Sequence, residues 1–270
     1  MQVDHDGAEI AVIGGSGFYD FLEDCVEVHV DTPYGPPSDS ILLGAVAGRR
    51  VAFLPRHARG HRYPPHKIPY RANLWALRSL GVRQVVAPCA AGGLRPELDA
   101  GSLLVPDQLV DRTSGRSQTY HDSGVVHVSF ADPYCPRGRA CVVDTARARG
   151  WRVTDGGSMV VVEGPRFSTR AESRWFGAMG WDVVNMTGHP EAVLARELAL
   201  CYTTMALVTD LDAGVEGAGA VTQSEVFAVF AENIGRLKAL VSEAVGALST
   251  SRDCPCGAAL DGMTLDLALP

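Results

Sequence analysis

Three short segments of the chain carry groups that can hold an anion, and each directly follows a run of apolar residues. Gly14-Gly15-Ser16-Gly17 follows residues 10–13, and a strand that ends in glycines exposes backbone N–H groups that can cradle a phosphate. Such a loop is more often only a tight turn, although the Ser16 hydroxyl favours an anion. A dinucleotide-binding fingerprint needs a third glycine at position 20, where the chain has Asp20, so a dinucleotide-dependent oxidoreductase is disfavoured.

The other two segments offer charged and hydroxyl donors. Pro55-Arg56-His57 follows residues 51–54; arginine presents a fork of N–H groups to phosphate and histidine adds a donor, although an arbitrary arginine is more often solvated. Thr187 lies between an apolar run at 182–186 and a helix expected to begin near Pro190, so its hydroxyl would lie at a helix N-terminus. Because open α/β sheets bind ligands at the carboxyl ends of strands, we expect an anion site there.

The elements that must position these residues alternate along the chain. A capping box at Thr222 and Glu225 begins a long final helix with apolar residues three or four apart up to Leu248. The alternation predicts an α/β fold, a single domain over residues 8–248 with a central mixed, twisted β-sheet flanked by helices, followed by a mobile tail over 249–270. Strands are expected at 9–13, 50–54, 84–87, 158–163, 182–186 and 202–209, and helices at 69–80, 137–149, 169–179 and 190–199.

Composition excludes several classes of protein. The 270 residues carry a net charge of −7, which argues against nucleic acid or an anionic membrane as the main partner. No run approaches the ~18 apolar residues of a transmembrane helix. The acidic first residues also lack the features of a signal peptide, so the expected location is cytoplasmic.

The seven cysteines mostly stand singly in apolar segments and are expected to be reduced, buried thiols. The exception is Cys254-Pro255-Cys256. Two cysteines cannot fill a tetrahedral zinc site, and the neighbouring sequence offers no second pair of ligands. This leaves a redox pair or, more simply, part of a disordered tail.

Further motifs follow in a fixed order. They are Arg59-Gly60-His61, Tyr70-Arg71-Ala72-Asn73, Glu163-Gly164-Pro165-Arg166-Phe167-Ser168-Thr169-Arg170-Ala171-Glu172-Ser173 and Thr209-Asp210-Leu211-Asp212. Together with the three segments above, their order over residues 9–248 resembles the trimeric purine nucleoside phosphorylases and, within them, the S-methyl-5'-thioadenosine phosphorylase branch. The resemblance implies a homotrimer in which phosphate, a co-substrate, attacks C1' of a purine nucleoside and releases the base, with no metal or organic cofactor.

The resemblance also implies a role for individual residues. Met186 would pack on the ribose and Phe167 beside the base, although Phe167 alone would suggest ordinary core packing. Asp210 would give the departing base its proton at N7, with Asp212 beside it in the purine pocket; burial raises a carboxyl pKa and suits it to that task. His57 is the second catalytic candidate. The positions implied for phosphate are Ser16, Arg56, His57, Cys89, Ala90 through its backbone N–H, and Thr187.

The nature of the nucleoside depends on a few positions. A carboxylate accepts hydrogen bonds from a 6-amino group but faces a 6-oxo group as a second acceptor, so Asp210 and Asp212 favour adenine. By the resemblance, Gln223 stands where an apolar residue usually faces a methylthio group, and Cys89 stands where a threonine is typical. The expected substrate is S-methyl-5'-thioadenosine; the alternatives are a general purine nucleoside phosphorylase acting on adenosine, inosine or guanosine, or a non-catalytic nucleoside-binding protein. The remaining specificity candidates are Ser168, Val226, Phe227 and, from a neighbouring subunit, His127.

Overall fold

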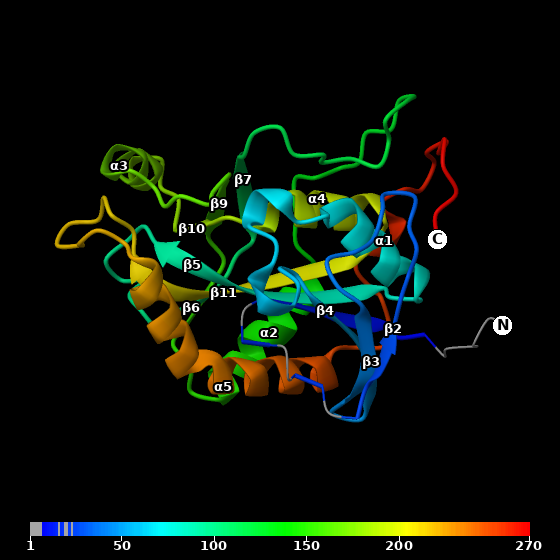
Figure 1. Ribbon diagram of the computed structural model, residues 1–270, viewed down its shortest axis with the longest axis horizontal. Coiled ribbons are helices and arrows are strands. Elements are labelled where there is room, and N and C mark those ends of the chain that lie inside the picture. Colours follow the sequence, from blue (N-terminus) through cyan, green and yellow to red (C-terminus); the bar gives the residue numbers. More distant parts are fainter. Residues whose placement is uncertain (1–6, 16, 19–20, 23) are drawn as a thin grey trace.

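A computed structural model describes residues 7–15, 17–18, 21–22 and 24–270. Within them, one mixed sheet of 11 strands runs through the molecule (Figure 1). Ser16 lies outside the described residues. The strands are β1 (Ile10–Gly14), β2 (Val26–Val28), β3 (Ile41–Val46), β4 (Arg49–Pro55), β5 (Gln84–Gly93), β6 (Leu103–Val105), β7 (Gln108–Arg112), β8 (Val153–Asp155), β9 (Ser158–Val162), β10 (Val183–Asn185) and β11 (Cys201–Leu211).

Helices cover both faces of this sheet, with α1 and α4 above the central strands in Figure 1 and α2 and α5 below them. Ala11 and Ile13 point into the core under α1 and α4, whereas Ile10 and Val12 point into the core under α2 and α5. This alternation is the two-residue period of a strand buried on both faces. The helices are α1 (Tyr70–Ser79), α2 (Pro136–Ala148), α3 (Arg170–Ala178), α4 (Gly188–Glu197) and α5 (Gln223–Ala247), with short 3-10 turns η1 (Arg59–His61), η2 (Pro65–Lys67) and η3 (Pro255–Ala258).

The sheet divides along β5, and this division makes room for a site. At its start β5 pairs in parallel with β1, up to Val86, while at its end Gly92 and Gly93 pair antiparallel with β10. On its other side β5 pairs in parallel with β11 along its whole length. Between Val86 and Gly92, therefore, one edge of β5 is left open at the carboxyl ends of the parallel strands. The mixed α/β sheet expected from the sequence is confirmed.

The C-terminal segment, expected from the sequence to be a mobile tail, makes contacts with the domain. It forms η3 and buries Cys256, which is 1% exposed. Leu267 and Leu269 pack against the core under α1 and α4, and Asp266 accepts a hydrogen bond from the Ser123 hydroxyl. The apolar side chains of this segment are spaced too irregularly to indicate a helix. They nevertheless pack against the domain. Among the described residues, no helix has the length and apolar character needed to span a membrane.

Candidate active site

A cavity of about 390 Å³ opens at the carboxyl ends of β1, β4, β5, β10 and β11, beneath the first turns of α5. His127 does not line it: this residue is exposed on the long loop between β7 and α2. With Ser16 outside the described residues, thirteen of the site residues expected from the sequence line the cavity. They are Arg56, His57, Cys89, Ala90, Phe167, Ser168, Met186, Thr187, Asp210, Asp212, Gln223, Val226 and Phe227.

Arg56 does not present the open fork that its sequence context suggests. Its Nε and Nη2 donate to the carboxylate of Glu191 at 2.7 and 2.8 Å, and the two side chains are 2% and 1% exposed. Further N–H groups donate to the carbonyls of Ile13 and Pro88, both at 3.2 Å. A guanidinium has five N–H donors, so what remains for a ligand is an Nη1 hydrogen beside Gly15. The pair carries no net charge, so this corner offers an anion a hydrogen-bond donor and no free cation.

His57 is a neutral imidazole with a defined tautomer. Its Nδ1 lies 2.8 Å from the Tyr63 carbonyl oxygen, and because a carbonyl only accepts, Nδ1 carries the hydrogen. Burial, aided by repulsion from Arg56, lowers the pKa of His57 to about 3. Nε2 is therefore a hydrogen-bond acceptor. The imidazole stacks on His61 with ring centroids 4.2 Å apart, which fixes its plane.

Asn185, rather than an anion, occupies the first N–H groups of α4. Its Oδ1 accepts hydrogen bonds from the backbone N–H of Thr187 and of Gly188, both at 2.7 Å, while its Nδ2 donates to the Ala90 carbonyl. Asn185 thus joins β5 to the start of α4. The Thr187 hydroxyl, on a 6% exposed residue, also donates to Asn185 Oδ1, at 3.3 Å. Toward a ligand it therefore offers its oxygen as an acceptor, and its hydrogen only after it turns away from Asn185.

Cys89 does not supply the hydroxyl of the threonine that it replaces. Its sulfur lies 3.7 Å from the Thr204 hydroxyl, and burial raises the thiol pKa to about 11. The thiol is therefore neutral at physiological pH. It adds no negative charge to the part of the cavity that is lined by Arg56, His57 and Thr187, which we call the anion corner.

Two aspartates form the other end of the cavity because β11 changes register there. The pairing of β11 with β5 shifts between Val208 and Asp210, a bulge that turns the Asp210 carboxyl toward the cavity. Burial raises the pKa of Asp210 to about 6, and repulsion from Asp212 adds to this, against a hydrogen bond from Thr209. A Cβ at Gly92 would lie 3.1 Å from Asp210 Oδ2, so glycine leaves room for this pair.

Two polar atoms at the Asp210 end of the cavity are buried. Neither Asp212 Oδ2 nor the Ser168 hydroxyl has a hydrogen-bond partner within the described part of the chain. Buried polar atoms in folded proteins are nearly always hydrogen-bonded. An acceptor and a hydroxyl, both in the wall of one cavity, fit a flat heterocycle that carries its own donors and acceptors.

The walls between these two ends are apolar. Phe167 and Met186 line the cavity from the loops after β9 and β10. Gly164 has φ +65°, and a Cβ there would lie 2.6 Å from Met186 Sδ, so only glycine allows the methionine this position. From α5, Val226 and Phe227 close the rim, and the Phe227 ring meets His61 edge to face at 6.4 Å. Gln223 lines the same rim as its polar member.

Three residues matter more than their sequence context showed. Glu191 and Asn185 lie close to Thr187 in the sequence, yet nothing local indicates that Glu191 neutralises Arg56 or that Asn185 accepts hydrogen bonds from the first N–H groups of α4. The helix α4 buries nine of its ten residues, and a carboxylate in so buried a helix needs a partner, which is the signal for Glu191. His61 lies four residues after His57 in a Pro- and Gly-rich stretch and has no periodic signal.

The described residues that could together hold a metal ion lie outside the cavity. Among the described residues, a close set of metal-type ligands occurs elsewhere, where Cys135, Cys201, Cys254 and Cys256 gather at the start of β11. The cavity itself pairs an anion corner with a carboxyl corner across an apolar middle. That arrangement suits cleavage of a bond between a sugar and a heterocyclic base by an anionic nucleophile.

Comparison with known proteins agrees with this chemistry. The chain is 65% identical to a purine nucleoside phosphorylase of Streptomyces coelicolor over 97% of this chain and 98% of that one. It is 58% identical to an S-methyl-5'-thioadenosine phosphorylase of Mycolicibacterium smegmatis over 97% and 99% of the two chains. A solved methylthioadenosine phosphorylase from an antarctic soil metagenomic library superposes with a TM-score of 0.89 at 39% identity, covering 95% of this chain and 92% of that one. Because the sequence model of the phosphorylase superfamily also matches residues 9–246, this chain belongs to that superfamily.

Proposed function

We propose that the protein cleaves S-methyl-5'-thioadenosine with inorganic phosphate, giving adenine and 5-methylthioribose 1-phosphate. The observation that carries the proposal is that one cavity is lined both by the Arg56 guanidinium with the Thr187 hydroxyl and by the Asp210 and Asp212 carboxyls. Breaking the glycosidic bond leaves positive charge on the ribose and negative charge on the purine. An anion on one side and a proton donor on the other stabilise both.

Phosphate binds in the anion corner through the free Nη1 hydrogen of Arg56 and the Thr187 hydroxyl. His57 Nε2 accepts the hydrogen of a protonated phosphate oxygen, which orients the nucleophile against C1'. Since Glu191 balances Arg56 and His57 is neutral, the site holds the phosphate without cancelling its charge. The phosphate oxygen that faces C1' therefore keeps its nucleophilicity. Cys89 and the backbone N–H of Ala90 complete the corner, with Ser16 as a further expected ligand.

The purine binds at the carboxyl corner. With a pKa of about 6, Asp210 is partly protonated near neutral pH and delivers its proton to N7 as the base departs. Asp212 Oδ2 accepts a hydrogen bond from the 6-amino group, and the Ser168 hydroxyl also bonds to the base. Phe167 packs beside the ring and Met186 against the ribose.

The 5' substituent meets Val226 and Phe227, which favour a methylthio group. Gln223 at the same rim supports the alternative, a general purine nucleoside phosphorylase that also takes adenosine, and so does the name given to the Streptomyces coelicolor relative. The reaction itself needs no metal or organic cofactor, because all charge in it is met by these side chains and by phosphate.

The assembly that fits the site is a homotrimer in a cytoplasmic setting. The loop between β7 and α2 projects from the body in Figure 1. It carries Val125, which is 81% exposed, and the exposed His127. A loop that carries an exposed apolar residue suits contact with a second subunit, where His127 would reach the 5' pocket of the neighbour. Seven free thiols suit a reducing compartment. Light scattering tests the trimer: a fully active monomer contradicts it.

The activity is tested by following base release from S-methyl-5'-thioadenosine, adenosine, inosine and guanosine, with and without phosphate. The proposal predicts release only with phosphate, in the order methylthioadenosine, adenosine, inosine. Arg56→Lys should raise KM for phosphate ~10-fold, because it removes the guanidinium geometry. Arg59→Lys is the matched control, since Arg59 is exposed and pairs with Glu27 outside the cavity. Release that is equal without phosphate would make the protein a hydrolase.

A further inference from the structure

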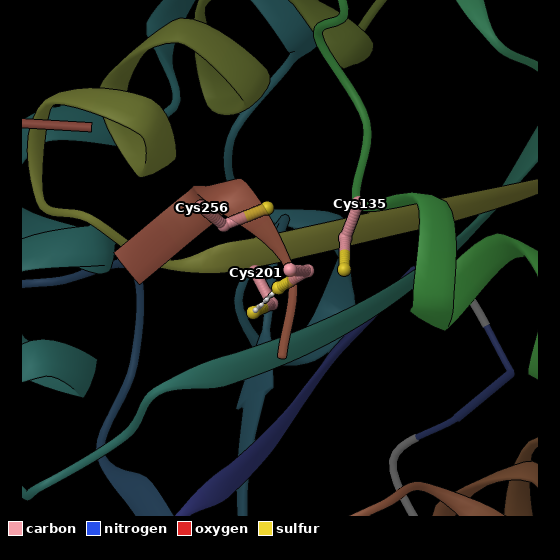
Figure 2. A group of neighbouring side chains, drawn as sticks. Cys135, Cys201 and Cys256 are labelled. Carbon is pink, nitrogen blue, oxygen red and sulfur yellow. Dashed lines mark hydrogen bonds between the residues drawn. The ribbon is translucent and has the colours of Figure 1, made fainter. Parts of the chain in front are cut away.

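Four cysteines that are far apart in the sequence meet at one point of the fold. Their sulfur atoms all lie within 4.8 Å of one another, and Cys201 Sγ is 3.4 Å from Cys254 Sγ. Figure 2 shows the side chains of Cys135, Cys201 and Cys256 converging from three different segments. Three of the four residues are buried and Cys254 is half-buried. We propose that these four cysteines form a structural binding site for a thiophilic divalent cation, Zn²⁺ in the first place.

The spacing of the sulfurs fits this ion. Tetrahedral zinc bonds to thiolates at about 2.3 Å, which places the four sulfurs about 3.8 Å apart. The distances here bracket that value, and the four residues supply a complete set of soft ligands. A closed set of four protein ligands is typical of structural rather than catalytic zinc. The local sequence around Cys254-Pro255-Cys256 has no second pair of ligands. In the fold, Cys135 and Cys201 supply that pair.

Each ligand is held by an ordered element. Cys135 is the N-cap of α2, and its sulfur already accepts a hydrogen bond from the Gly138 backbone N–H at 3.4 Å. Cys201 begins β11, where its backbone N–H donates to the Arg83 carbonyl. Cys254 is the N-cap of η3 and Cys256 lies inside it. These elements present the sulfurs on fixed backbone, as metal ligands require.

The surroundings suit the charge of such a complex. Binding proceeds as Zn²⁺ displaces the four thiol protons to solvent, and the resulting zinc tetrathiolate carries a net charge of −2. Arg78 Nε donates to the Leu198 carbonyl and Arg252 Nη2 to the Ala199 carbonyl, just before Cys201. Within the described residues, Arg78 Nη1 and Arg252 Nε are buried without a hydrogen-bond partner. Neither arginine forms an ion pair with another described residue, so a metal tetrathiolate would add negative charge near two uncompensated cations.

The site is remote from the cavity and serves stability. Cys201 and Asp210 lie nine residues apart on β11, roughly 30 Å at the rise of a strand. The metal ties the C-terminal segment to α2 and to the sheet, so its loss lowers Tm without changing the chemical step. The proposal is independent of the proposed phosphorolysis, since metal content and turnover are measured separately.

The test begins with metal analysis of the full chain, purified with a reductant and without chelator. About one equivalent of zinc per chain is expected. Chelation under reducing conditions should lower Tm, and added ZnCl₂ should restore it where MgCl₂ does not, because Mg²⁺ prefers oxygen ligands. Added CoCl₂ should give the visible absorption bands of tetrahedral cobalt bound to thiolates, a readout that needs no variant and no activity.

Cys254→Ser is the variant of choice because Cys254 is the least buried ligand. It should lose the zinc and the zinc-dependent rise in Tm, and keep the wild-type kcat at a temperature where it is folded. Cys25→Ser is the matched control, since Cys25 lies before β2, outside the cluster, and this variant should keep both. A wild-type chain that takes up neither Zn²⁺ nor Co²⁺ overturns the proposal, whether its four cysteines are free or joined as disulfides. Retention of the metal by Cys254→Ser overturns it as well.

Discussion

Arg56 and Glu191 form a buried ion pair, with Arg56 Nε 2.7 Å from Glu191 Oε2, and this pair rather than a free cation faces the anion corner of the cavity. Glu191 Oε1 also accepts a hydrogen bond from the Tyr202 hydroxyl at 2.9 Å. The guanidinium is therefore locked in orientation, and its donors are divided between structure and ligand. A phosphate bound here meets a rigid hydrogen-bond donor and little net positive charge.

Glu191→Gln should weaken phosphate binding and destabilise the fold. It leaves the Arg56 charge buried and unpaired, which costs about 3–5 kcal/mol in other proteins. KM for phosphate should change by ~10-fold or more, since the guanidinium loses its orientation, while KM for the nucleoside moves less. Steady-state kinetics and urea unfolding measure the two effects. Glu243→Gln, which breaks the surface pair with Arg149, is the control and should change neither by much. Unchanged phosphate kinetics in Glu191→Gln would show that the pair does not position Arg56.

Asp210→Asn should stabilise the protein at neutral pH and not at pH 4. The folded-state pKa of Asp210 is about 6 against 3.8 unfolded, so between these values the folded state binds more protons. The stability contributed by this group therefore falls as pH rises through that window, by up to about 3 kcal/mol. Asparagine removes the cost. Urea unfolding at pH 4.5 and 7.5 checks this, with Asp144→Asn on the exposed face of α2 as control. A stability difference from wild type that does not grow with pH would contradict the raised pKa.

His57 has the opposite effect on stability. Its folded-state pKa is about 3 against 6.5 unfolded, so in that window the unfolded state binds more protons and stability falls on acidification. The slope is at most about 1.4 kcal/mol per pH unit. Between pH 4 and 6 this slope opposes that of Asp210. His57→Gln should therefore lose less stability than the wild type between pH 6.5 and 4.5, whereas His29→Gln, at an exposed position, should follow the wild type. If His57→Gln and the wild type lose the same free energy of unfolding between pH 6.5 and 4.5, the folded-state pKa of His57 is not lowered.

Gln223→Leu should sharpen the preference for an apolar 5' substituent. The methylthio group then meets Val226, Phe227 and leucine, while a 5'-hydroxyl loses a polar partner. A difference of this kind is worth ~1–3 kcal/mol, so the ratio of kcat/KM for methylthioadenosine over adenosine should rise ~10-fold. Ser224→Ala, one residue further along α5 and not lining the cavity, should leave the ratio unchanged. A ratio unchanged in Gln223→Leu would place the 5' group elsewhere.

The sequence predicts regular, buried elements well because their residues repeat. Periodicity placed α2 at 137–149, and the helix is Pro136–Ala148. The strand expected at 84–87 runs to Gly93 instead. Its second half contains Pro88, Gly92 and Gly93, residue types that are typical of loops. The reason for Gly92 is a tertiary contact, because it leaves room for the Asp210 carboxyl. Short edge strands such as β8, three residues long, have too little pattern to predict.

The site likewise contains residues that the sequence predicts and residues that it does not. Arg56 and Thr187 were found from the sequence because each follows an expected strand. Other residues of the cavity, such as Phe167 and Gln223, were found only through the family resemblance. Partners that are distant in the sequence were not found: Glu191 is 135 residues from Arg56, and Cys254 is 119 residues from Cys135. Such pairs are set by tertiary packing, and no local spacing encodes them. The register shift that turns Asp210 into the cavity is likewise visible only when β11 is paired with β5.

Analysis of the products formed from S-methyl-5'-thioadenosine in phosphate buffer tests the phosphorolysis most directly. Mass spectrometry with ¹⁸O-labelled phosphate should show adenine and, in equal amount, a methylthioribose ester that carries all four labelled oxygens, because a phosphate oxygen forms the new bond to C1'. Free methylthioribose without label, or no turnover despite nucleoside binding, would contradict it.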